Sequence, residues 1–144
     1  MDSRLIVTSA FAAHLVGGLL LAVSYAAVDV TFTEQQGEFL VFVGVLGPLF
    51  SLLLIWAGNG VLGAPLFVAS TGGTAWYTAY FFFVHDNPGT VWVAEGDAST
   101  AYLFSAVTLV TVSFAAALVG CWLWYRESEG FRAVVDALLR STRT

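Results

Sequence analysis

Four long apolar runs alternate with short polar stretches along the chain. They cover residues 5–28, 39–57, 64–84 and 101–125. Each run has about the 20 residues that a helix needs to cross the hydrocarbon core of a bilayer. None shows the alternation of a barrel strand, and a helix satisfies its own backbone hydrogen bonds in lipid. The pattern predicts an all-α membrane protein, a bundle of four transmembrane helices in one integral membrane domain over residues 1–144.

A shorter apolar pattern follows the last run. In residues 130–141 the apolar side chains recur at spacings of three and four, and they are Phe131, Val134, Val135, Leu138 and Leu139. This spacing predicts an amphipathic helix of about three turns. Because it follows a span directly and carries arginines, we expect it to lie in the cytoplasmic interface, with its apolar face toward acyl chains. Docking of that face on a partner subunit is the alternative.

The composition agrees with a membrane protein and suggests its orientation. Apolar residues make up 58% and charged residues 10% of the chain, against roughly 45–50% and about 25% in soluble domains. Its five basic residues are all arginines, and all lie before the first run or after the last. The positive-inside rule therefore predicts a multi-pass protein of the cell membrane with both termini cytoplasmic. The absence of lysine and the acidic connections at 29–38 and 85–100 resemble the composition of membrane proteins in extremely halophilic archaea.

Few groups inside the runs could carry chemistry. None of the runs has an Asp, Glu, Arg or Lys in its interior, and the chain has neither a phosphate-binding GK[ST] loop nor a G-x-S-x-G nucleophile motif. The two histidines differ in predicted depth, since His14 lies near mid-membrane and His85 follows the third run. This argues against one haem held by both, and leaves a haem shared between subunits open. We expect no enzyme, no cofactor, no metal and no nucleic-acid partner.

His14 is the one ionisable residue in the first run apart from Tyr25 with its phenol. It belongs to a stripe in which small residues recur every four positions. The other members of this stripe are Ala10, Gly18, Ala22 and Ala26. Small residues let membrane helices approach closely. We therefore predict that the stripe is the packing face of the first helix and that His14 points into the bundle.

Polar groups at matching depth on the other runs could bond to His14. Together with His14, the predicted mid-membrane polar layer consists of Gly44, Ser70, Thr74 and Ser113. Pro48 has no N–H to donate to the Gly44 carbonyl, so that oxygen is free. Burial disfavours the charged imidazole. We expect a neutral His14 bonded to a hydroxyl of the third run (Thr74 or Ser70), with the Ser113 hydroxyl or the Gly44 carbonyl as second partner.

Two classes of function fit this sequence. The first is a non-enzymatic accessory or assembly subunit of a larger membrane complex, in which the polar layer only fixes helix packing. The alternative is a small solute, ion or proton transporter completed by oligomerisation, with His14 in its polar layer. An isolated polar layer would favour the first, and a polar track to both surfaces the second. In both cases the expected partners are the lipid bilayer and either a homo-oligomer or a larger complex.

Overall fold

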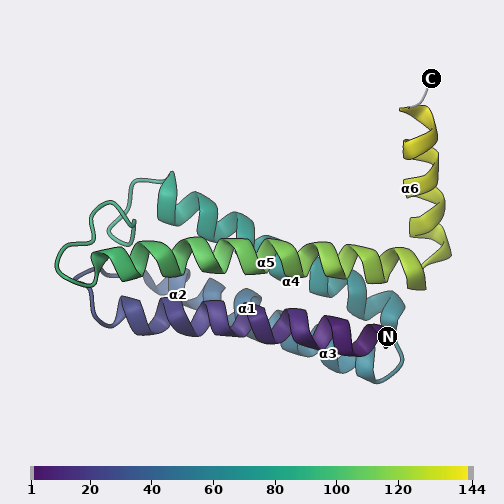
Figure 1. Ribbon diagram of the computed structural model, residues 1–144, viewed down its shortest axis with the longest axis horizontal. Coiled ribbons are helices and arrows are strands. Elements are labelled where there is room, and N and C mark those ends of the chain that lie inside the picture. Colours follow the sequence, from purple (N-terminus) through teal and green to yellow (C-terminus); the bar gives the residue numbers. More distant parts are fainter. Residues whose placement is uncertain (1, 143–144) are drawn as a thin grey trace.

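Long antiparallel helices make up most of the protein (Figure 1). The computed structural model describes residues 2–142, which form helices and turns without a strand. The elements are α1 (Ser3–Tyr25), α2 (Glu34–Val41), the π-helix η1 (Phe42–Leu46), α3 (Gly47–Trp56), α4 (Gly60–Phe83), α5 (Ser99–Glu127) and α6 (Glu129–Ser141). Three of the predicted runs therefore each correspond to one helix. The run 39–57 corresponds to three consecutive segments, α2, η1 and α3, which together form one long helical rod.

Three of the rods are long and apolar enough to cross a membrane. They are Ser3–Tyr25, Glu34–Trp56 and Ser99–Glu127. The helix over the predicted third run, α4, has 24 residues but a less apolar middle, where serine, threonine and glycine gather in the stretch 70–74. Many of its side chains are buried against other helices, and a face turned to protein does not need to be apolar toward lipid.

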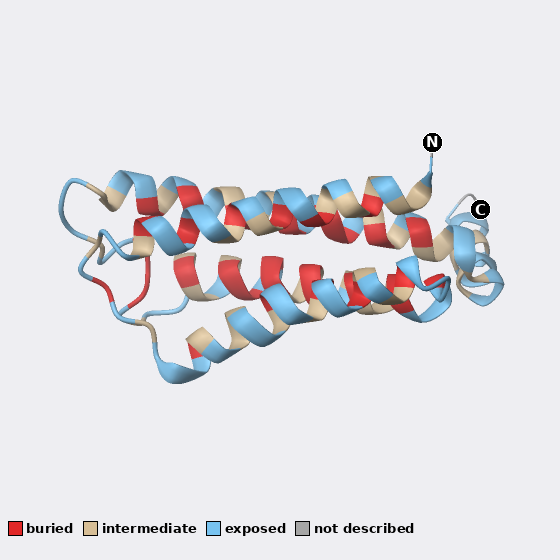
Figure 2. Ribbon diagram, turned by 90° about the horizontal axis from the view of Figure 1, so that it is seen from below, coloured by how far each residue is buried: buried red, intermediate tan, exposed pale blue. Residues whose placement is uncertain are grey.

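The helices pack around α5 and α4. Helix α5 contacts both α1 and α4, and α3 packs against α4 and less extensively against α1. Buried residues lie on the facing sides of the rods, and exposed residues lie outside (Figure 2). The first residues of α1, the α3–α4 turn and the end of α5 lie at one end of the bundle, and the α1–α2 and α4–α5 connections lie at the other (Figure 1).

The packing face of α1 differs from the predicted small-residue stripe. Its buried residues are Val7, Phe11, His14, Gly17, Leu21 and Ser24. Ala22 and Ala26 are exposed, Ala10 and Gly18 are half-buried, and a Cβ placed on Gly18 would meet nothing within 4 Å. The predicted packing stripe was therefore wrong at Gly18, Ala22 and Ala26, whereas His14 is buried and Ala10 packs against the hydrophobic core. The close approach occurs at Gly17, where a Cβ would lie 2.7 Å from Val112 Cγ2 of α5.

Helix α6 turns away from the bundle after α5 (Figure 1). The Phe131 ring stacks on Trp124 with centroids 4.0 Å apart. The Tyr125 hydroxyl donates to Asp136 at 2.9 Å, and the Arg132 guanidinium donates to a carbonyl at the end of α5 at 2.7 Å. These contacts fix the angle between α5 and α6. They leave the apolar side chains farther along α6 exposed, among them Leu138 at 62%.

Candidate functional site

His14 joins three helical segments in the middle of the bundle. Its side chain is 2% exposed. Nδ1 lies 2.8 Å from the Ser113 Oγ of α5, and Nε2 lies 2.6 Å from the Gly44 carbonyl oxygen of η1. A carbonyl oxygen only accepts, so Nε2 carries a proton and donates it. In the neutral ring Nδ1 is then the acceptor, and the Ser113 hydroxyl donates to it.

The Gly44 carbonyl lacks its usual α-helical donor. An α-helix would bond this oxygen to the N–H of residue 48, but that residue is Pro48. The chain also widens here into the π-helix, where the N–H of Gly47 bonds the carbonyl of Phe42, five residues earlier. Single π turns within α-helices occur frequently at functional sites. The proline identified from the sequence therefore lies beside an acceptor that His14 does use.

Ser70 and Thr74 do not bond the imidazole as expected. The Thr74 hydroxyl donates to the Ser70 carbonyl at 2.8 Å, and the Ser70 hydroxyl donates to the Leu66 carbonyl at 2.8 Å. Serine and threonine in a helix find such an acceptor in their own preceding turn without any tertiary arrangement. We expected either the Ser113 hydroxyl or the Gly44 carbonyl to be the second hydrogen-bond partner of His14. In the structure both are partners, one at each ring nitrogen.

Thr74 nevertheless belongs to the surroundings of His14. Its side chain is 1% exposed. A Cβ placed on Gly44 would lie 3.5 Å from the Thr74 Oγ1, an ordinary van der Waals distance, so Thr74 of α4 directly faces Gly44 of η1. The structure therefore brings four of the five polar-layer residues together around one point, with two of them bonded to His14.

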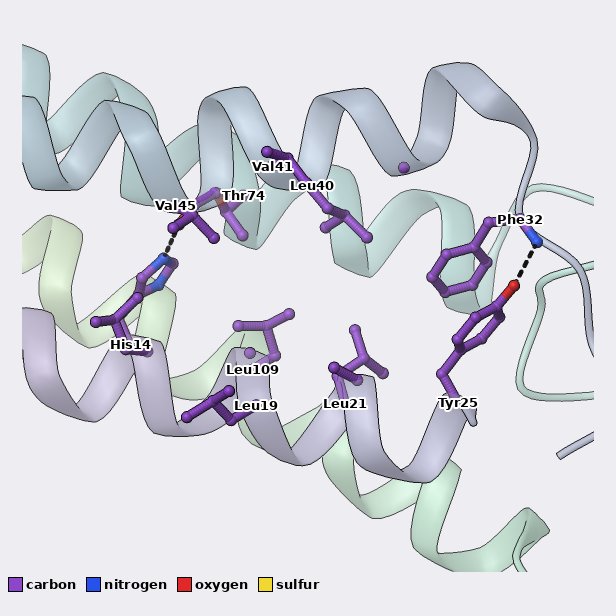
Figure 3. A pocket seen from close by; sticks show the side chains of 15 residues that line it. His14, Leu19, Leu21, Tyr25, Phe32, Leu40, Val41, Val45, Thr74 and Leu109 are labelled. Atoms are coloured by element: carbon purple, nitrogen blue, oxygen red, sulfur yellow. Dashed lines mark hydrogen bonds between the residues drawn. The ribbon is translucent and has the colours of Figure 1, made fainter. Parts of the chain in front are cut away.

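A cavity of about 420 Å³ lies beside this layer. It is bounded by α1 on one side and by α2 and η1 on the other, as Figure 3 shows. His14 and Thr74 stand at one end of it, and Tyr25 with Phe32 at the other. Most of the residues between these ends are apolar.

The small residues of the predicted stripe border this cavity. Gly18 and Ala22 line its α1 side, which is why they make no close helix contact. Helix α1 makes few contacts with α2, although the sequence alone predicted that α1 would approach its neighbours along this face. Here the absence of large side chains leaves space between the helices.

A second polar link between α1 and α5 was missed in the sequence. The hydroxyls of Ser24 and Ser105 lie 2.6 Å apart and both residues are buried. In an antiparallel pair of helices, a residue farther along one helix lies beside a residue nearer the start of the other. Ser24 is ten residues after His14, so the His14–Ser113 contact predicts that Ser24 lies near position 103 of α5. The register between the two helices was the missing information.

The second histidine is far from the polar layer. His85 is exposed, follows α4, and stacks on Tyr80 with centroids 5.5 Å apart. Within residues 2–142, no group of three or more His, Cys, Asp or Glu side chains could hold a metal ion.

No family model, curated protein or solved structure matches this chain. Its function is therefore inferred from the chemistry of the His14 layer and of the adjoining cavity.

Proposed function

We propose that the chain is a non-enzymatic accessory or assembly subunit of a larger membrane complex, with four transmembrane helices and both termini in the cytoplasm. The observation that carries this proposal is the pairing of His14. Both ring nitrogens are bonded within the chain, to Ser113 and Gly44. A buried imidazole with no free nitrogen favours a role in fixing helix register over a role in binding substrate.

The packing of α4 supports a fourth span. Its 24 residues extend about 36 Å as an α-helix, which exceeds the roughly 30 Å of a hydrocarbon core. It runs between helices that are themselves apolar enough to span. With a fourth crossing, the start of α1 and the end of α5 would lie on the same side of the membrane.

The positions of the arginines support the proposal that one end of the bundle faces the cytoplasm. Arg4 lies over the Trp56 ring at 5.8 Å, and Arg126 lies over the Trp122 ring at 5.0 Å. Tryptophan is enriched at membrane interfaces, and arginine at the cytoplasmic one. We assign this end of the bundle to the cytoplasm.

Helix α6 would then lie on the cytoplasmic leaflet. Its exposed apolar residues include Val134 (58%), Leu138 (62%) and Leu139 (57%). An interfacial helix buries such a face among acyl chains and keeps its arginines near anionic headgroups. Docking on a partner subunit would cover the same face, so the lipid contact has its own test.

That test compares one substitution on each side of α6. Leu138→Asp places a charge on the apolar face, and Ala133→Asp places it on the opposite face of the helix. In nanodiscs, Leu138→Asp is expected to speed amide hydrogen exchange throughout α6, whereas Ala133→Asp leaves it close to that of the unmodified protein. Equal exchange in all three proteins would contradict the interfacial placement.

Transport is the second candidate, and the cavity beside His14 is the observation in its favour. The walls of that cavity are mostly apolar, whereas a proton or ion route needs polar groups or water along its length. An apolar cavity therefore gives this candidate less support than the pairing of His14 gives to the first.

One preparation distinguishes the two. The tagged chain is purified from its native membrane in a mild detergent, and the mass and composition of the complex are measured. Proton flux is then measured in proteoliposomes of the isolated chain and of its His14→Phe variant. The proposal expects a partner of fixed stoichiometry and no flux above protein-free liposomes. A homo-oligomer whose flux disappears in His14→Phe would overturn it.

A further inference from the structure

We propose that the cavity between α1 and α2 holds one hydrocarbon chain of a membrane lipid, drawn from the leaflet nearest to the α1–α2 connection. This inference rests on the membrane-spanning arrangement proposed above. It adds a ligand class that neither the accessory role nor transport requires.

The length of the cavity matches half a bilayer. Its two ends are marked by His14 and Tyr25 on α1, which are eleven residues apart. That separation corresponds to about 16 Å along a helix axis, and one leaflet contributes about half of the roughly 30 Å hydrocarbon core. The volume of about 420 Å³ lies within the range of about 300–1,000 Å³ common for ligand sites.

The polar groups at the two ends differ in what they can still bond. At the deep end, both His14 nitrogens are occupied and the Thr74 hydroxyl donates to a carbonyl of its own helix. At the other end, the Tyr25 hydroxyl accepts the Phe32 N–H at 3.3 Å, and among residues 2–142 no acceptor for its own proton is found. A ligand therefore meets only apolar or satisfied groups at depth, and one available donor near the surface. An acyl or isoprenoid chain with an ester or ether oxygen at its head has this polarity.

The cavity opens sideways toward the membrane. Leu19, Val41 and Val45 line it and are 65%, 52% and 43% exposed. They come from α1 on one side and from α2 and η1 on the other, and in a bilayer such exposed apolar side chains face lipid. A lipid chain can enter between them without crossing water.

Two contacts close the ends of the cavity, one between α1 and η1 and one between α1 and the α1–α2 connection. At one end, the His14 Nε2 donates to the Gly44 carbonyl. At the other, the Tyr25 and Phe32 rings stack with centroids 4.1 Å apart (Figure 3). Between them, Gly18 and Ala22 supply little side-chain volume. The space is therefore bounded by specific contacts at both ends.

The contacts at both ends of the cavity argue for a hydrocarbon chain and against a helix of another protein. A helix about 10 Å wide cannot lie between the two sides where the His14 Nε2 is 2.6 Å from the Gly44 carbonyl oxygen, or where the Tyr25 and Phe32 rings stack with centroids 4.1 Å apart. A single hydrocarbon chain is much narrower than a helix.

Photocrosslinking in nanodiscs tests the site. The probes are two phosphatidylcholines, one with a diazirine at the end of an acyl chain and one with a diazirine close to its carboxyl carbon. Mass spectrometry maps the adducts. The terminal probe is expected to label residues near His14, such as Gly18 and Val45, and the other probe is expected to label the region of Tyr25. Labelling of the cavity at no higher level than the outer faces of the bundle, or without this order in depth, would overturn the site. So would protein–protein adducts there in place of lipid adducts.

A cavity-filling variant provides the second measurement. Gly18→Leu with Ala22→Leu places side chains in the cavity and is expected to abolish the ordered labelling. The matched control is Ala12→Leu with Ala69→Leu, two exposed positions that line none of the cavities described, and it is expected to label as the unmodified protein does. Unchanged labelling in the filled variant would contradict the proposal. If the filled variant does not fold, the depth order in the unmodified protein decides alone.

These results separate the lipid site from the accessory role. Loss of the ordered labelling in a protein that still purifies with its partner rejects the lipid site alone. Ordered labelling in a protein that purifies without a partner and conducts protons rejects the accessory role alone.

Discussion

The adjacent glycines of α1 give the sharpest test of the packing. A Cβ on Gly17 would lie 2.7 Å from Val112 Cγ2 and 3.3 Å from the Leu109 Cα, whereas a Cβ on Gly18 would meet nothing within 4 Å. Gly17→Ala should therefore destabilise the bundle, and Gly18→Ala should not. The sequence pattern alone predicts the reverse, because it assigned Gly18 to the packing face.

The magnitude follows from the two contacts. A methyl at position 17 requires α5 to shift or Val112 to leave its rotamer, and valine is stiff at χ1. Overpacking of this kind costs about 1–3 kcal/mol, and replacing glycine by alanine within a helix recovers about 1 kcal/mol. Gly17→Ala should thus lose about 1 kcal/mol and Gly18→Ala gain about 1 kcal/mol, a difference of about 2 kcal/mol.

Reversible unfolding in mixed micelles, driven by sodium dodecyl sulfate and followed by far-ultraviolet circular dichroism, measures this difference. The unmodified protein and the two alanine variants are compared under one detergent composition. Equal stability of the two variants, or a larger loss in Gly18→Ala, would refute the helix packing described here.

Three further predictions concern the polar layer and the topology. Ser113→Ala removes the hydroxyl that His14 Nδ1 bonds and should cost about 1 kcal/mol in the same unfolding assay, and full stability would show that this bond contributes nothing. His14→Phe should cost less in a Pro48→Ala background than alone, because residue 48 then has an N–H for the Gly44 carbonyl; additive losses would contradict this coupling. A reporter fused after Thr144 should remain cytoplasmic, and its appearance outside would overturn the proposed orientation.

Much of the local structure was readable from the sequence. The apolar runs at 5–28, 39–57 and 101–125 predicted helices of spanning length, and the structure confirms three helices long and apolar enough to cross a membrane. The run at 64–84 was also correctly predicted as helical, over Gly60–Phe83. Hydrophobic length and backbone hydrogen bonding are local properties, so they can be recognised without knowing which helices are neighbours.

The neighbours of each side chain required the tertiary structure. Successive residues of a helix point about 100° apart. The spacing of small residues pointed to Gly18 as the contact position, and only the placement of α5 shows that the contact is made at Gly17. Likewise, Pro48 identified the free Gly44 carbonyl in the sequence, but the register of α1 against α5 and η1 determines that His14 reaches both Gly44 and Ser113. The cavity depends on the same information, since its volume lies between helices whose separation no local pattern encodes.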